Sequence, residues 1–287
     1  RVLRCPRQWE WLTSTLELRR TSLEVYEACR YESTLVLRVE NDTPKWVITD
    51  GQTITDGRPQ RRGRIPALRV SRIVWNANNF WLKKWIRSQD RLQGISFLKN
   101  VWKFESVDWP SSMTDLSLPD KFNQPIVCAA LPKRISYLTF GRKFNQAIVG
   151  VEWPKTLVHL HFGVNFNQPV VGVEWPETME RLGFGHDFNQ PIVGVKWPET
   201  MERLQFGHHF NQSIVGVEWP KKLLALEFGY AFNQPIVGVK WPESLKELKL
   251  GVWFNQPIVG VKWPETTERL EFGYAFNQPI VGVKWPE

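Results

Sequence analysis

The sequence predicts a mainly β protein, a right-handed parallel β-solenoid of 22-residue repeats with an N-terminal capping region. The first observation is the string Phe-Asn-Gln, which recurs without insertion or deletion, its Phe at positions 122, 144, 166, 188, 210, 232, 254 and 276. The second is a Leu-x-Phe alternation in most repeats, the spacing of a short strand with one face inward. A fixed period of this length is typical of solenoids, in which each unit buries its apolar face only against its neighbours.

Residues 175–197 represent one repeat, and its strand is expected at Leu182 and Phe184. Stacking successive turns would pair the equivalent strands in parallel, at about 4.7–4.9 Å from one another. Gly185 is expected to end the strand by adopting backbone angles that other residues resist. Phe188 should then fill the interior.

The rest of the repeat is expected to form corners and a short extended segment. Asn189 should be buried and bond the turn backbone, so that the repeated Asn residues form a ladder, and Pro191 should fix the corner. Met179, the third residue after Pro176, should pack inward from a single turn of 3₁₀ helix. Alternation through residues 192–197 puts Val193, Val195 and Trp197 on one face, and Ile192, Gly194 and Lys196 on the other.

The second of these faces carries a column of charges: Glu152, Glu174, Lys196, Glu218, Lys240, Lys262 and Lys284. Because charges must be solvated, the Trp column on the opposite face is expected to point into the interior. The alternative is an exposed aromatic ladder that stacks on sugars or nucleobases.

The pattern P-x-x-L-x-x-L-x-F-G-x-x-F-N-Q-P-I resembles the FNIP repeat family, over about residues 109–287. The resemblance implies a solenoid like that of leucine-rich repeats, used for protein–protein contact, and it brings no catalytic residues. The family's Leu-Pro occurs once, at Leu131-Pro132, whereas the other units read Trp-Pro, which demands a roomier interior.

The domain prediction is a basic N-terminal cap region of mixed structure at 1–91 and solenoid repeats at 92–287, degenerate at 92–121 and regular at 122–287. The first 100 residues hold 19 Lys or Arg against 10 Asp or Glu, whereas the remainder is nearly neutral. The basic residues expected to form a docking patch are Arg58, Arg61, Arg62, Arg64, Arg69, Arg72, Lys83, Lys84, Arg87 and Arg91. Such a patch fits an acidic protein surface. Because Trp and Phe side chains interleave with it, nucleic acid is a less favoured alternative. A plain solvated surface without a partner is the other alternative.

A second candidate surface follows from comparing the repeats with one another, because the columns that flank the strand and follow its Gly change from turn to turn. These side chains should point away from the core as one continuous strip that binds a partner. Its members are Tyr137, His159, His161, Arg181, Arg203, Gln205, His186, His208, Glu227, Tyr230, Lys249, Trp253, Arg269 and Tyr274. The competing interpretation is an exposed face that varies without function.

His186 and His208 occupy one column on adjacent turns and could hold a metal or sense pH. With no Cys or Glu to complete a shell, the prediction is no metal and no cofactor. Glu227 and Glu271 stand two turns apart with Lys249 between them, which argues against a glycosidase pair. The sequence also lacks nucleophile, phosphate-loop and zinc-protease motifs, so we predict that the protein is not an enzyme.

The predicted function is a non-catalytic scaffold, linker or adaptor, and a suitable setting for it is that of a stoichiometric subunit in a large assembly. The alternative is a module that recognises nucleic acid or glycan through the basic segment and the Trp columns. Three cysteines without metal spacing, the absence of a visible signal peptide and a first residue other than Met favour an intracellular or organellar setting. No apolar run is long enough to span a membrane.

Overall fold

The structure is a computed structural model that describes residues 35–40, 43–48, 72–76, 94–97, 109–127 and 131–286. The chain divides into two compact units, one of residues 1–102 and 108–119 and the other of residues 103–107 and 120–287. The described residues form strands and turns and contain no helix. It follows that none of these residues belongs to a helix suited to crossing a membrane.

The described residues of the first unit form five strands: β1 (Leu35–Glu40), β2 (Thr43–Ile48), β3 (Arg72–Asn76), β4 (Gly94–Phe97) and β5 (Asp115–Ser117). β1 and β2 pair antiparallel, whereas β1, β3, β4 and β5 pair in parallel in that order. Ile73 lies opposite Ile95, and Ile95 opposite Leu116. The spacing of the first pair equals that of the regular repeats, so β3 resembles a repeat strand in its register. The predicted division at residue 91 stays a prediction.

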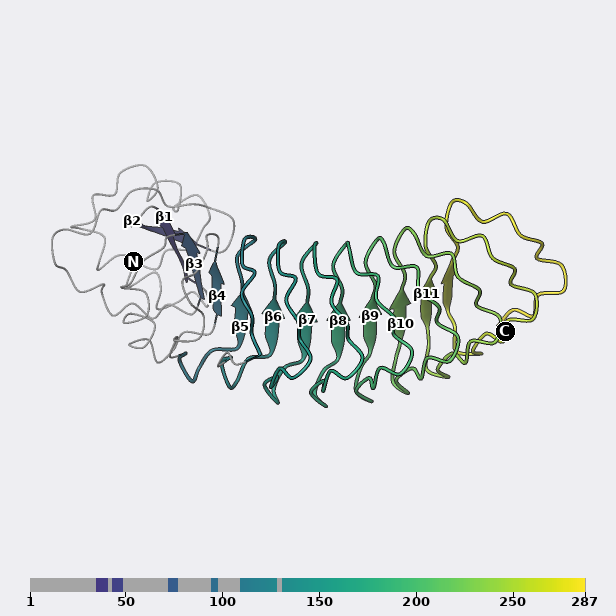
Figure 1. The fold of residues 1–287 in the computed structure, drawn as a ribbon, viewed down its shortest axis with the longest axis horizontal. Helices are drawn as coiled ribbons and strands as arrows, with labels where there is room; N and C mark the ends of the chain where they lie inside the picture. Colours follow the sequence, from purple (N-terminus) through teal and green to yellow (C-terminus); the bar gives the residue numbers. More distant parts are fainter. Residues whose placement is uncertain are drawn as a thin grey trace, which may run out of the picture. The chain divides into compact units, whose positions relative to one another are not determined.

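The second unit contains the regular repeats (Figure 1). Its strands are β6 (Tyr137–Thr139), β7 (His159–His161), β8 (Arg181–Gly183), β9 (Arg203–Gln205), β10 (Ala225–Glu227), β11 (Glu247–Lys249) and β12 (Arg269–Glu271). Each pairs in parallel with the next, and every residue lies opposite the one 22 positions later. The prediction of a mainly β, parallel solenoid of 22-residue repeats is confirmed.

Columns of large apolar side chains fill the interior of the turns. Leu182 in the strand, Phe184 just after it and Phe188 at the following corner are all buried. The rings at this corner stack along the solenoid, with 6.0 Å between the centroids of Phe188 and Phe210. Met179 is also buried, and its N–H donates to the carbonyl of Pro176, so the single tight turn predicted there is present.

The Trp column lies inside, as predicted. The six tryptophans from Trp153 to Trp263 are no more than 9% exposed, and most neighbouring rings stack, as Trp175 and Trp197 do at 6.4 Å. Their indole N–H groups have no hydrogen-bond partner in the structure. The alternative of an exposed Trp ladder is therefore wrong for these six residues, and Trp285, in the last turn, is 45% exposed.

The segment before each Trp differs from the predicted alternation. Ile192 is buried and Val193 exposed, the reverse of the expectation, although Val195 and Trp197 do point inward. The N–H of Val195 bonds the carbonyl of Ile192 across a tight turn, in which Gly194 has φ of 86°. A left-handed Gly at this place is the signature of a type II turn, which reverses the chain and breaks the period of two.

Gly185 is needed for a reason other than the predicted one. Its φ is not among the positive values, which belong to Gly194 and its equivalents. Instead, a Cβ at Gly185 would lie 1.7 Å from the carbonyl oxygen of Gly163, one turn earlier. These glycines allow the backbones of successive turns to approach closely.

The predicted Asn ladder is present, although its side chains are half-buried where full burial was expected. The Oδ1 of Asn189 accepts from the backbone N–H of Asn211 at 2.9 Å and from Nε2 of Gln212 at 3.0 Å. The same pair of bonds recurs from one turn to the next through the second unit. Each Asn therefore joins two turns.

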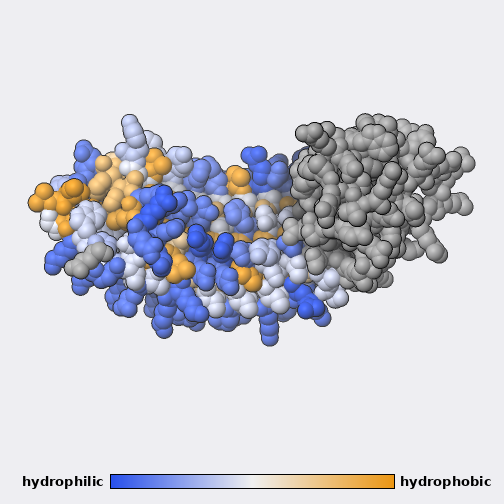
Figure 2. Space-filling model, turned by 180° about the vertical axis from the view of Figure 1, so that it is seen from behind, coloured by the Kyte–Doolittle hydropathy of each residue, from blue (hydrophilic) through white to orange (hydrophobic). Residues whose placement is uncertain are grey.

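Apolar side chains are uncovered at the final turn. Figure 2 shows hydrophobic residues gathered at this end of the second unit. Ile280 is 55% exposed, whereas its equivalent Ile192 is fully buried. The difference follows from the one-dimensional packing of a solenoid, in which the next turn covers each core position.

Candidate partner-binding face

The sheet of the second unit buries one face and presents the other to solvent. The middle Leu of each strand points inward, so the residues on either side of it point outward. The outward column before the Leu consists of Tyr137, His159, Arg181, Arg203, Ala225, Glu247 and Arg269. The column after it consists of Thr139, His161, Gly183, Gln205, Glu227, Lys249 and Glu271. A shallow groove of about 330 Å³ runs along these columns from Tyr137 to Lys249.

At the β6 end of the groove, aromatic and imidazole side chains lie against one another. The rings of Tyr137 and His159 stack with centroids 4.4 Å apart. The ring of His161 lies over Gly183, where a Cβ would come within 2.6 Å of its Cδ2. Gly183 therefore interrupts the strip of side chains and makes room for the imidazole of the preceding turn.

Both groove histidines favour their neutral form. Desolvation lowers the pKa of His159, and the positive charge of Arg181 lowers it further. Desolvation also lowers the pKa of His161, against an opposing contribution from its backbone hydrogen bond with Phe162. This end of the face therefore offers uncharged rings beside a cation.

Charge along the face changes from one end to the other. Arg269 pairs with Glu271, and Arg203 approaches Glu247 at 4.0 Å. In contrast, no carboxylate in the described part of the chain forms an ion pair with Arg181. The β7–β9 end is thus the more basic and the β10–β12 end carries mixed charge, an arrangement that would orient a charged partner.

A third column follows the Gly after each strand. Its exposed members include His208, Tyr230 and Tyr274, with Trp253 beside it and 60% exposed. A second shallow groove, of about 370 Å³, lies between this column and the strands of β6–β9. All of the predicted strip residues therefore lie at the surface of the second unit, and binding by them remains a prediction.

The predicted neighbours His186 and His208 do lie side by side, with ring centroids 4.5 Å apart. The structure also supplies a carboxylate that the sequence reading missed. The Oδ1 of Asp187 lies 2.9 Å from Nδ1 of His186 and 3.5 Å from Nδ1 of His209. Asp187 and His209 are 22 residues apart, so the repeat register could have revealed this pair.

The structure bears on the carboxylate pair of the sheet face, whereas most of the basic patch lies outside the described residues. Lys249 of β11 lies between Glu227 and Glu271 in the sheet register, as expected. Of the predicted docking patch, Arg72 is the first residue of β3 and the other nine residues lie outside the described ones. The cysteines Cys5, Cys29 and Cys128 also lie outside them.

The FNIP Repeat family model matches residues 210–252 and 232–262. These repeats are FNIP repeats, and the resemblance predicted from the sequence is confirmed over this range. No curated protein matches the chain.

Proposed function

We propose that this FNIP-repeat solenoid is a non-catalytic scaffold or linker that binds a protein partner along the outward face of its β-sheet. The observation that carries the proposal is the contrast between a nearly constant core and outward columns whose residues vary along the solenoid. Burial, the Asn ladder and the glycine turns account for most of the constant residues. The variable surface columns combine Tyr, His, Arg, Glu and Trp in an order that does not repeat. A recognition surface needs such a non-repeating order.

The shape and chemistry of the face support this role. Seven strands at the usual spacing give a surface on the order of 30 Å long, held in place by a fully packed interior. Tyr, Trp and Arg are the residues most enriched among those that dominate interface energies. Tyr137, Arg181 and Arg203 line the first groove. Trp253 and Tyr274 are exposed beyond it and extend the aromatic surface.

We further propose that the basic N-terminal patch docks on a second, acidic partner, so that the chain links two components of a larger assembly. The sequence supports this docking, because residues 1–100 carry a net charge of +9. Unlike charges on facing surfaces raise the association rate and exclude wrong partners. The repeats, by contrast, are close to neutral.

Crosslinking mass spectrometry on the natively purified protein, after size exclusion, tests both contacts. Lys249 lies in the groove, whereas Lys196, Lys240 and Lys262 belong to the separate charge column and serve as internal controls. We expect a stoichiometric partner that crosslinks to Lys249, and an acidic partner that crosslinks to Lys83 and Lys84. A lone monomer, or crosslinks to the charge column alone, would contradict the proposal, and crosslinks to RNA or DNA would establish the nucleic-acid alternative.

A matched pair of variants tests the face directly. Arg181→Glu with Arg203→Glu reverses the charge of the groove, whereas Lys196→Glu with Lys240→Glu makes the same net change on the charge column. We expect the first pair to abolish partner capture and the second to leave it intact. Equal loss in both would show that only net charge matters.

A further inference from the structure

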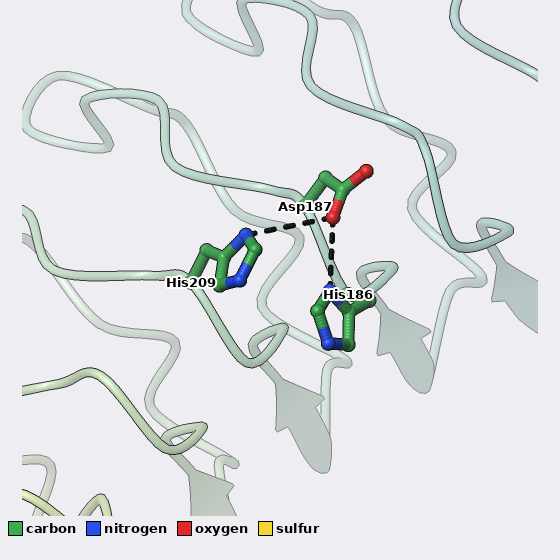
Figure 3. A group of neighbouring side chains, drawn as sticks. All are labelled: His186, Asp187 and His209. Atoms are coloured by element: carbon green, nitrogen blue, oxygen red, sulfur yellow. Dashed lines mark hydrogen bonds and ion pairs between the residues drawn. The ribbon is translucent and has the colours of Figure 1, made fainter.

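The corners that follow β8 and β9 bring four polar residues together. The two turns read Gly-His-Asp-Phe and Gly-His-His-Phe at the same repeat position. The offset of 22 residues therefore sets His186 beside His208, and Asp187 beside His209. Figure 3 shows the carboxylate of Asp187 between the imidazoles of His186 and His209, with a ring nitrogen of each directed at the same oxygen.

The geometry points to a metal site formed by His186, Asp187 and His209. Each residue offers one ligand atom, and the three atoms lie within 4.8 Å of one another. In a tetrahedral zinc site, bonds of about 2.0–2.1 Å place the ligand atoms about 3.3–3.4 Å apart. In the structure, Oδ1 of Asp187 lies 2.9 Å from Nδ1 of His186 and 3.5 Å from Nδ1 of His209, and these two distances lie on either side of that value. We propose that this trio binds one divalent transition-metal ion, with Zn²⁺ the representative case.

The backbone holds the three residues in place before any ion arrives. The N–H of Asp187 donates to the carbonyl of Val164 at 2.8 Å, and the N–H of His209 donates to the carbonyl of His186 at 3.0 Å. The next residue in each turn, Phe188 and Phe210, is fully buried. Only side-chain rotations are therefore needed to close the ligands on an ion, which keeps the entropic cost of binding small.

The donor atoms select the class of metal. Two imidazoles and one carboxylate suit zinc and the neighbouring transition metals, whereas Ca²⁺ and Mg²⁺ require a shell of oxygen atoms. The side chains of His186, Asp187 and His209 remain 40%, 38% and 59% exposed. Because three protein ligands leave a coordination position open, water or a side chain of another molecule can complete the shell. The site does not depend on the proposed partner-binding role.

Titration of the full chain with Zn²⁺, followed by calorimetry, tests the proposal. Asp187→Asn keeps the shape of the side chain but removes its charge, and His209→Ala removes a ligand. We expect each to eliminate one equivalent of Zn²⁺ or to weaken it by more than about 100-fold, since altering even an outer-shell partner costs 10–100-fold. Any Zn²⁺ bound by the cysteines would still bind to both variants, so a loss of binding reports on the trio alone.

His208→Ala is the matched control, because His208 precedes His209 in the same turn and its ring contacts His186 without belonging to the trio. We expect His208→Ala to bind the equivalent of Zn²⁺ that Asp187→Asn and His209→Ala lose. Co²⁺ substitution should give the intense visible absorption of a tetrahedral site in the wild type and in His208→Ala, and not in Asp187→Asn. Unchanged melting of the metal-free variants shows that they fold. If the wild type and Asp187→Asn bind the same number of Zn²⁺ ions with the same affinity, the proposal is overturned. The trio is then a hydrogen-bonded cluster only.

Discussion

Asn189 satisfies a backbone donor of the next turn that no strand pairing reaches. Replacing Asn189 with Ala would leave the N–H of Asn211 without its acceptor and would remove the bond from Gln212. Losing an acceptor for a partly buried donor costs about 1–3 kcal/mol. We therefore expect Asn189→Ala to lower the midpoint of urea unfolding, measured by Trp fluorescence.

Asn189→Asp is the control for that substitution, because a carboxylate oxygen can accept both bonds. We expect it to retain most of the stability that Ala loses. If Asp and Ala destabilise equally, the amide group contributes through something other than the ladder.

His161 should make the stability of the second unit depend on pH. Desolvation lowers the pKa of His161 below the ordinary value of 6.5 that it regains on unfolding. Between these two pKa values the unfolded chain binds more protons, so stability rises with pH there. The contribution is fully present above pH 6.5 and is lost as the pH falls through the lower, folded-state pKa.

The variant His161→Gln removes this titration. We expect a flatter profile of unfolding midpoint against pH between 5 and 7.5 than in the wild type, because one group with different pKa values in the two states is absent. Superimposable profiles would show that His161 does not contribute.

The two glycines of each repeat differ in what they demand from the backbone. A Cβ at Gly207 would lie 1.7 Å from the carbonyl oxygen of Gly185, so Gly207→Ala must force successive turns apart. Gly194 has nothing within 4 Å of its Cβ position, and Gly194→Ala meets only the strain of a φ of 86°. We expect a cost of about 1–2 kcal/mol for Gly194→Ala and of more than about 3 kcal/mol for Gly207→Ala, each measured by urea unfolding.

Gly194→Asn separates the two causes, because Asn tolerates the left-handed region better than Ala does. It should recover part of the stability that Gly194→Ala loses. Gly207→Asn should recover none of the stability that Gly207→Ala loses, because any Cβ at this position overlaps the carbonyl oxygen of Gly185. Recovery at both positions would contradict the assignment of close approach to Gly207.

Periodicity predicted the strands, the parallel register and the inward Leu, Phe and Trp columns, because each depends on residues that recur at fixed spacing. It failed at residues 192 and 193, since alternation assumes an extended backbone and the left-handed Gly194 turns the chain there. It also assigned the wrong cause to Gly185, because close approach between turns is a property of the stack. Asp187 was missed because it shares its repeat position with His209, in the column beside that of His186 and His208, and the comparison of variable columns did not include that position.

As a whole, the second unit behaves as a one-dimensional stack, in which every turn contacts only its neighbours. The hydrogen bonds between turns join residues 21 to 23 positions apart, as the bonds of Asn211 and Thr200 show. Removing one full period should therefore leave every remaining bond with an equivalent partner. Stability in such arrays is approximately a sum over repeats and their interfaces.

Deletion of residues 216–237 tests this directly, because it joins Val215 to Gly238 and so restores the Val-Gly corner. We expect a folded protein whose long dimension, measured by small-angle scattering, is shorter by about 4.8 Å and whose unfolding midpoint falls only slightly. Deletion of residues 216–226, half a period, joins Val215 to Glu227 and places polar residues at core positions. Because the turns on either side keep their own register, the damage should be confined to the junction, and this variant should have a clearly lower unfolding midpoint than the full-period deletion. Equal midpoints for the two deletions would contradict the requirement for a 22-residue register.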